Sequence, residues 1–133
     1  MADTSPVKGT RAAIAKSGTA HARGLAAEAR AAEMLERCGF VILARRARTT
    51  AGEIDLIARR DGLLVFCEVK ARATLILAGE SVLPRQRRRI VAAAEAFLAN
   101  HPELERLDMR FDAVLVSRRG EIEHLPGAFD AGG

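Results

Sequence analysis

Two carboxylates, Asp55 and Glu68, have the residue types and the spacing to hold a divalent cation. They lie in two apolar, strand-like runs, Glu53–Arg59 and Leu63–Arg72, and the link between the runs contains Asp61-Gly62. Asp-Gly between two apolar runs predicts a tight β-hairpin. In that register the two carboxylates lie directly opposite each other on one face, with Cβ atoms about 4.5–5.5 Å apart. Like charges so placed repel unless a cation lies between them, and we expect Mg²⁺, with Mn²⁺ as a substitute.

Lys70 adds an amine to the same face, because residues two apart in a strand point the same way, and the register places it opposite Glu53. An ammonium there can hold or help to deprotonate a water, and it can stabilise charge on a phosphate. The alternative is a solvated face, which is the ordinary origin of a Glu-x-Lys pattern. We favour a buried site, because this strand is apolar on both faces and Lys70 is the only lysine after residue 16.

Glu28 is a third acidic candidate, on a helix that we expect from Ala20 to Cys38. It falls inside the apolar stripe of that helix rather than opposite it. A carboxylate that faces the core needs a partner. Two alternatives remain open: an ion pair with a nearby arginine, or the same metal site, as a further ligand or through water. The predicted stripe consists of Leu25, Ala29, Ala32 and Leu35.

Arginines crowd the start of a second predicted helix, where cations oppose the helix dipole. Binding a phosphate is a reason to accept that cost, and a plain solvated surface is the alternative. A second group of arginines extends the predicted positive surface around the acidic pair, and of these we favour Arg46 and Arg48. The predicted nucleic-acid-binding residues are Arg46, Arg48, Arg72, Arg85, Arg87, Arg88 and Arg89.

The predicted elements form one mixed α/β domain with a central sheet. Asp112, in the fourth strand, is expected to pair with an arginine and brace the fold rather than to take a direct part in chemistry. Arg45, Arg46 and Arg48 are predicted to lead into a loop that ends at Gly52. In chain order we expect helix 20–38, strands 40–46, 53–59 and 63–72, loop 73–79, helix 83–100, and strands 110–117 and 121–125.

Composition limits the other function classes. The 133 residues carry a net charge of +4, which allows a polyanionic partner, but the absence of Trp and Tyr argues against a base-stacking platform. Residues 1–18 are predicted to be a flexible basic tail before a single domain at 19–133. With no signal-like or membrane-spanning run, and with two distant cysteines that we expect to be buried free thiols, the sequence indicates a cytoplasmic protein without a membrane partner.

Several short motifs occur together in an order that resembles a known family. The chain is similar, over about residues 20–129, to the YraN-like family of small bacterial proteins, which is assigned to the PD-(D/E)xK, restriction-endonuclease-like superfamily. The matching motifs are Gly24-x-x-x-Glu28, Gly39-Phe40, Arg48, Gly52-Glu53-Ile54-Asp55-Leu56-Ile57, Glu68-Val69-Lys70-x-Arg72 and Arg110-Phe111-Asp112.

This resemblance implies an αβββαβ nuclease core like that of archaeal Holliday-junction resolvases. It implies that Asp55, Glu68 and the carbonyl of Val69 bind Mg²⁺, that Lys70 is the catalytic lysine, and that Glu28 is the helix carboxylate. One position departs from the pattern: after Pro84-Arg85, members usually carry Lys-Gln, where this chain has Gln86-Arg87. Arg85 or Arg87 could supply the missing charge.

We therefore predict a Mg²⁺-dependent nuclease, with DNA a better candidate than RNA and branched DNA among the candidate substrates. Two alternatives use the same fold without cleavage. One is a nucleic-acid-binding module, and the other is an interaction subunit of a larger assembly.

Overall fold

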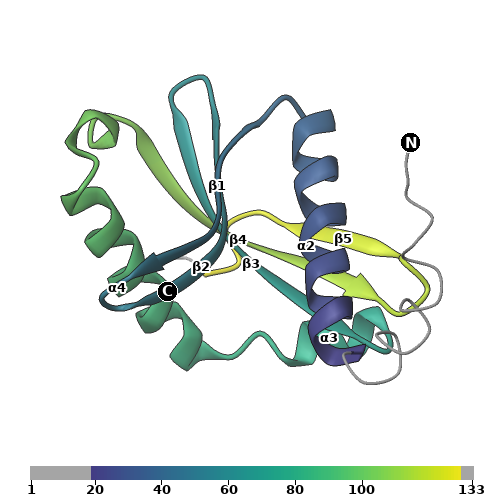
Figure 1. The fold of residues 1–133 in the computed structure, drawn as a ribbon. Helices are drawn as coiled ribbons and strands as arrows, with labels where there is room; N and C mark the ends of the chain where they lie inside the picture. The colour runs from purple at the N-terminus through teal and green to yellow at the C-terminus, as the bar shows by residue number, and fades with distance from the viewer. Residues whose placement is uncertain (1–18, 130–133) are drawn as a thin grey trace, which may run out of the picture.

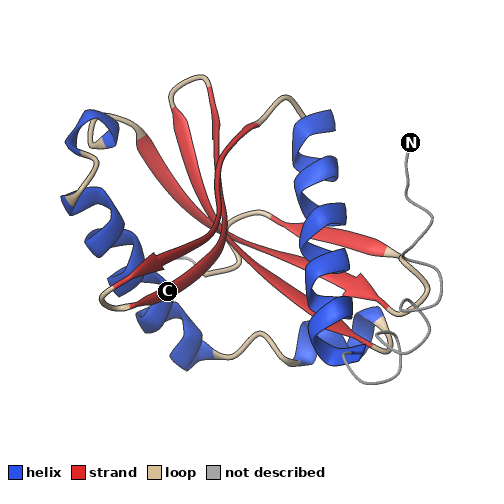
Figure 2. Cartoon of the chain, in the orientation of Figure 1, coloured by secondary structure: helices blue, strands red, loops and turns tan. Residues whose placement is uncertain are grey.

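The computed structural model describes residues 19–129, which form a five-stranded sheet with helices on both faces (Figures 1 and 2). The predicted tail, residues 1–18, lies outside the described residues, as do residues 130–133. Among residues 19–129, no helix is long and apolar enough to cross a membrane. The elements in order are α2 (Thr19–Arg37), β1 (Val41–Thr49), β2 (Gly52–Arg60), β3 (Leu63–Arg72), α3 (Leu75–Glu80), α4 (Pro84–Ala99), the 3-10 turn η1 (Pro102–Leu104), β4 (Asp108–Ser117) and β5 (Ile122–Leu125).

The strands lie in the order β1-β2-β3-β4-β5, and every neighbouring pair is antiparallel except β3 and β4, which are parallel. A parallel pair needs a long crossover, and here the connection runs through α3, α4 and η1. The order of helix, three antiparallel strands, helix and strand is the αβββαβ arrangement of a restriction-endonuclease-like core, with β5 added at one edge.

The sheet is covered by α2 on one face and by α4 on the other, and each helix seals its own apolar core. The side chains of β3 alternate between the two: Leu64 and Phe66 pack with α4, whereas Val65 and Cys67 pack with α2. Ile90 and Ala94 of α4 close the first core, and Ala31 and Leu35 of α2 close the second. Because both faces are covered, β3 is buried from Leu64 to Glu68, as its apolar sequence predicts.

The hairpin between β2 and β3 opens into a fork. Its ladder begins beside the Asp61-Gly62 turn and ends at Leu56↔Cys67. Beyond that point β2 continues with β1 as far as Thr49↔Gly52, and β3 continues with β4 as far as Arg72↔Ser117. In Figure 1 the β1–β2 arm reaches α4, while β3 runs toward α3. We call this divergence of β2 and β3 the fork.

Several boundaries predicted from the sequence are wrong. The arginine loop is strand, because β1 extends to Thr49 and pairs with β2 throughout that stretch. Arg46 has a positive φ of 51°, an irregularity inside this strand. The predicted loop 73–79 contains α3, which begins where the Thr74 side chain accepts a hydrogen bond from the Leu77 N–H.

The predicted apolar stripe of α2 is correct only in its second half. Ala32 and Leu35 are buried as predicted, whereas Leu25 is 42% exposed and Ala29 is exposed, and the helix buries Ala27 and Ala31 against the sheet in their place. Small alanines let the helix lie close to the strands, so that alanine positions rather than the leucine at 25 form the contact face. Cys38 is exposed and only Cys67 is buried, which corrects the expectation of two buried thiols.

Candidate active site

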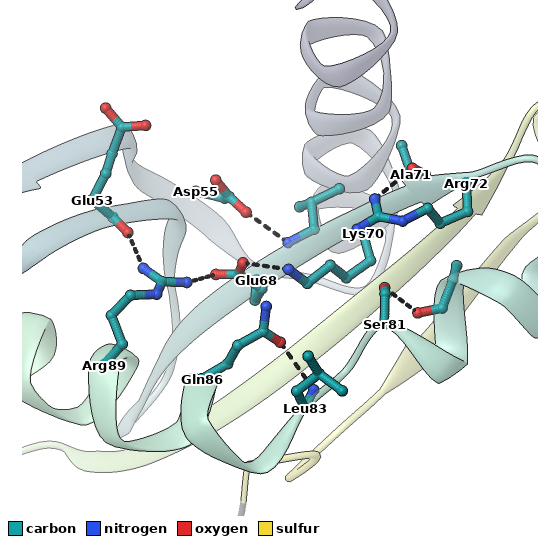
Figure 3. A network of polar contacts seen from close by, with 12 residues as sticks. Glu53, Asp55, Glu68, Lys70, Ala71, Arg72, Ser81, Leu83, Gln86 and Arg89 are labelled. Carbon is teal, nitrogen blue, oxygen red and sulfur yellow. Dashed lines mark hydrogen bonds and ion pairs between the residues drawn. The ribbon is translucent and has the colours of Figure 1, made fainter. Parts of the chain in front are cut away.

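At the fork, a hydrogen bond to the side chain of Asp55 replaces a backbone hydrogen bond of the β2–β3 ladder. Asp55 lies one residue beyond the last β2–β3 pair, and its Oδ2 accepts a hydrogen bond of 2.8 Å from the backbone N–H of Val69 (Figure 3). The predicted hairpin register is confirmed for the five pairs from Arg60↔Leu63 to Leu56↔Cys67, but the ladder ends before the predicted pair of Asp55 with Glu68. The Asp55 carboxylate caps the open end of the ladder and is fixed between the two strands.

The predicted pairing of Glu53 with Lys70 does not form, because the strands have separated at that point. Glu53 pairs with Arg48 across the β1–β2 ladder, and its carboxylate lies 3.5 Å from the Arg48 Nε and 3.9 Å from the Arg46 Nε. In Figure 3 the Glu53 carboxylate points away from Lys70. Glu53 thus belongs to the β1–β2 arm.

Glu68 is buried and Lys70 is largely covered on the α4 side of β3, continuing the series of Leu64 and Phe66. Glu68 is only 7% exposed. Its Oε2 lies 3.1 Å from the Lys70 Nζ, and its Oε1 lies 2.9 Å from Nη2 of Arg89. A solvated Glu-x-Lys face is therefore the wrong interpretation of this motif.

Arg89 points from α4 into the fork rather than outward to solvent. Besides its contact with Glu68, its Nη1 donates a hydrogen bond of 3.1 Å to the carbonyl of Glu53. The positive φ of 136° at Gly52 lets the chain turn close to the Arg89 side chain. Arg89 was predicted only as a surface contact for nucleic acid, and the structure places it inside the acidic site.

The charge on Asp55 is poorly compensated. Burial and, to a smaller extent, the neighbouring Glu68 carboxylate raise its pKa to about 7, because the hydrogen bond from Val69 and the Lys70 ammonium only partly oppose these effects. Lys70 and Arg89 both contact Glu68 rather than Asp55. The negative charge at the fork therefore favours binding of another cation next to Asp55.

Glu28 reaches the same place from α2. Burial raises its pKa, while the nearby Arg46 charge and a hydrogen bond with the Asp55 carboxyl lower it in part. Both alternatives predicted for Glu28, pairing with an arginine and joining the acidic site, therefore find support. The charge of Arg46 acts on Glu28, and Asp55 is hydrogen-bonded to it. The structure brings Glu28 to Asp55 from the face opposite to α4.

The donors present fit a partly hydrated hard cation. Carboxylate oxygens of Asp55 and Glu68 and the backbone of Val69 meet at the fork, and Mg²⁺ favours one or two carboxylates with water completing its shell. Among residues 19–129 no group of three or more His, Cys, Asp or Glu side chains is placed to hold a metal ion together. Both oxygens of Glu68 contact cations of the protein, so Arg89 and Lys70 compete electrostatically with a metal ion for this carboxylate.

The remaining predicted arginines are dispersed. Arg46 and Arg48 lie on β1 beside Glu53, and Arg87 and Arg88 line a separate hollow on the outer side of α4. Arg85 lies in the first turn of the same helix, where Gln86 accepts a hydrogen bond from the Leu83 N–H, which gives Gln86 a capping role. Arg72 lies on the other face, next to α2.

A groove along α2 leads into the fork and was missed by sequence reasoning. Arg23 and Gly24 of α2 face Val69 and Arg72 of β3 across a hollow of about 380 Å³ that also reaches Glu28. The available signal was the spacing of Arg23, Ala27 and Arg30, which repeats at helical intervals and puts two arginines beside a contact residue.

The comparison with known proteins decides the family. The model of the uncharacterised protein family UPF0102 matches residues 27–116. The chain belongs to this family. The match confirms the resemblance to YraN-like proteins, and Glu28, Asp55, Glu68, Lys70 and Arg89 all lie within the matched range.

UPF0102 relatives cover most of the chain. A UPF0102 protein of Azorhizobium caulinodans is 68% identical over 114 residues, 86% of this chain and 87% of its own length. One from Rhodopseudomonas palustris is 57% identical over 108 residues, 81% of this chain and 83% of its own. One from a Bradyrhizobium species is 56% identical over 108 residues, 81% and 77% of the two chains.

Asp112, in the Arg110-Phe111-Asp112 motif, lies outside the fork and braces the fold. It is fully buried, pairs with Arg110 through two hydrogen bonds of 2.8 and 2.9 Å, and contacts His124 Nε2 at 2.7 Å and the Gly127 N–H at 2.9 Å. Burial raises its pKa, but the hydrogen bonds from His124, Arg110 and Gly127 outweigh burial and leave the pKa below its usual value. The predicted arginine brace is present.

Proposed function

We propose that this UPF0102 protein is a Mg²⁺-dependent nuclease of the PD-(D/E)xK type that hydrolyses phosphodiester bonds in DNA. The observation that carries the proposal is the fork, where Asp55, with a pKa raised to about 7, lies beside Glu68 and Lys70. Here the cations satisfy Glu68 and leave Asp55 undercompensated.

The residues that would hold the ion are Asp55, Glu68 and the carbonyl of Val69, with Glu28 as a further ligand or a partner through water. When bound, Mg²⁺ supplies Lewis-acid polarisation of a phosphate and lowers the pKa of a coordinated water. The chain's own contribution is to fix the donors: the Val69 N–H orients the Asp55 carboxylate, and the fork keeps both strands apart around it.

The position of Lys70 suits it to orient a water molecule and to stabilise negative charge on a phosphate. Its Nζ lies 3.1 Å from Glu68 Oε2, and its side chain is only 11% exposed, so the ammonium is aimed into the fork rather than at bulk solvent. From there it can orient an attacking water and stabilise the negative charge that develops on the phosphate. Arginine would bring a permanent charge and a larger planar group, which explains why a lysine suits this position.

Arg89 has two alternative partners in this proposal. Without substrate it neutralises Glu68 Oε1, which makes a buried carboxylate tolerable. A phosphate entering the fork offers the guanidinium a bidentate partner of its own. The exchange would release Glu68 for the cation as the substrate arrives.

One observation favours a second candidate function, a nucleic-acid-binding module that does not cleave. Both oxygens of Glu68 already contact the cations Arg89 and Lys70. Because the charge of Glu68 is compensated by these side chains, the fold of the site does not depend on a bound metal. The arginines would still attract a polyanion.

A cleavage panel separates the two candidates. We expect wild-type protein with Mn²⁺ or Mg²⁺ to cut at least one of duplex, single-stranded, flap or four-way-junction DNA, or RNA. Lys70→Ala should lower the rate at least a hundredfold while oligonucleotide affinity stays within about threefold. Asp108→Asn, an exposed charge change far from the fork, is the control and should cut normally. An inert panel with retained, salt-dependent binding would refute the nuclease and leave the binding module.

A further inference from the structure

A pocket on the α2 face is lined by several positively charged side chains. It encloses about 300 Å³ between the first half of α2 and the ends of β3 and β4, which Figure 1 shows side by side. Four arginines line it, and no acidic residue does. They are Arg23, Arg30, Arg72 and Arg118. We call this the arginine pocket.

The topology explains why the arginines meet. Strands β3 and β4 are parallel, so both end at the same edge of the sheet, where Arg72 pairs with Ser117 and the Arg118 N–H donates to the Ala73 carbonyl at 3.2 Å. Arg30 of α2 crosses this edge and donates to the carbonyl of Gly120. The ends of β3 and β4 and the helix α2 thus fix the positions of these arginines.

The guanidinium groups keep donors free for a ligand. Within the described part of the chain, none of the four has a carboxylate within 4.0 Å. Arg30 and Arg72 each have one backbone carbonyl as a partner, and a guanidinium has five N–H donors. Four like charges around one small space repel one another, and an anion between them removes that repulsion.

The shape of the arginine pocket fits a small anion with an apolar neighbour. Four alanines, Ala26, Ala27, Ala71 and Ala73, line the pocket together with the arginines, and their short side chains leave space between the long ones. A phosphate group fits the charged walls, and a sugar fits the alanine lining. A volume of about 300 Å³ lies at the small end of ligand sites and suits about one nucleotide unit.

The arginine pocket continues into the fork. Arg23, Ala27, Ala71 and Arg72 line both this pocket and the neighbouring hollow that reaches Glu28 and Val69. The two hollows therefore form one groove along α2, positive at the Arg118 end and acidic at the fork. The arginines of α4 lie on the opposite face of the sheet from this groove.

We infer that the arginine pocket binds a backbone phosphate of nucleic acid, and that the strand then runs along α2 into the fork. The nature of the ligand rests on the proposed nuclease function, while the phosphate chemistry rests on the four arginines themselves. The inference assigns strand entry to the α2 face, which sequence reasoning had left to Arg72 alone.

Phosphate chemistry is tested with inorganic phosphate in EDTA, by following the arginine side-chain N–H signals in NMR. We expect titration to shift the signals of Arg23, Arg30, Arg72 and Arg118 and to leave those of Arg106 and Arg119 in place. Arg119 is the matched reference, because it is exposed in the same turn as Arg118 but does not line the pocket. Equal shifts of all arginines, or no shifts, would overturn the pocket.

Nucleic-acid binding is tested without metal, by anisotropy of a labelled single-stranded oligonucleotide. The double variant Arg23→Ala/Arg118→Ala should bind at least about tenfold more weakly, and its salt slope should fall by about two. The control double variant Arg106→Ala/Arg119→Ala carries the same charge change and should lose less than about threefold. Equal losses in both variants would refute the assignment, and circular dichroism melts check that each is folded.

The outcomes distinguish this inference from the proposed function. Phosphate and oligonucleotide binding at the pocket in a protein that cuts nothing would support the inference and refute the nuclease. Cleavage with unchanged oligonucleotide affinity in Arg23→Ala/Arg118→Ala would refute the inference alone. Binding of free phosphate that oligonucleotide does not displace would overturn the assignment to nucleic acid.

Discussion

At the scale of single residues, the two carboxylates of the fork differ in how far their negative charge is compensated. Glu68 has both oxygens paired with cations of the protein, whereas Asp55 has the Val69 N–H and a pKa raised to about 7. A carboxylate that the fold keeps charged at a cost is common where function requires it. The cost itself is measurable without knowing the substrate.

Asp55→Asn should stabilise the metal-free protein. The amide keeps an oxygen to accept the Val69 hydrogen bond and removes the repulsion from Glu68 and Glu28. We expect the free energy of unfolding, from urea melts in EDTA at pH 7.5, to rise by about 1–2 kcal/mol. Asp108→Asn, an exposed and equally isosteric change, should leave it within about 0.5 kcal/mol. A loss of stability in Asp55→Asn would show that the charge is compensated after all.

Arg89→Ala should strengthen binding of Mn²⁺ relative to Arg88→Ala. Both changes remove one charge from the same turn of α4, but only Arg89 contacts Glu68 Oε1. Removing this competitor leaves Glu68 available as a ligand, so we expect affinity for Mn²⁺ about three- to tenfold higher in Arg89→Ala, measured by calorimetry. Equal affinities in the two variants would mean that Arg89 does not compete with the cation.

At the scale of elements, sequence patterns predict local pairing well and long-range packing poorly. The Asp61-Gly62 turn is decided by the residues next to it, so the register of β2 and β3 follows directly. The fork does not follow, because the point where β2 leaves β3 depends on β1 and β4 at the outer edges. The side chain of Arg89 could not be placed in the fork for the same reason: its direction is set by how α4 crosses the sheet.

Asp112 joins β4 to β5 and to the segment that follows, so it is a test of the fold rather than of the fork. Asp112→Asn leaves Arg110 and His124 without their anion in a buried site and should cost about 3 kcal/mol of unfolding free energy at pH 7. Thermal or urea melts measure this. The arginine and lysine contacts of Glu68 share no residue with this network, so metal binding should survive the change.

The pH dependence of that loss has a definite sign. The pKa of Asp112 is lower in the folded protein than in the unfolded chain, so its contribution is complete above the unfolded value near 4. It is lost as the pH falls through the still lower folded value. The difference in stability between wild type and Asp112→Asn should therefore shrink as the pH falls below 4. A difference that grows in acid would contradict the assignment.

At the scale of the whole molecule, the sheet separates two basic faces that a sequence cannot tell apart. A net charge of +4 and clustered arginines predict attraction to a polyanion, but they do not say on which side it binds. The first helix illustrates the difficulty: its predicted stripe included Leu25, which is exposed, and passed over Ala27, which forms the contact. Once α2 is turned correctly, Arg23 and Arg30 lie together along one groove.

Calorimetric titration of Mn²⁺ tests most directly whether the fork is a cation site. Titrations with an oligonucleotide present should show one ion bound to the wild type, and at least about tenfold weaker binding to Asp55→Asn and to Glu68→Gln. Glu121→Gln, an exposed change outside the fork, should bind as the wild type does. Heat that is absent from wild type, or unchanged in both fork variants, would contradict the account.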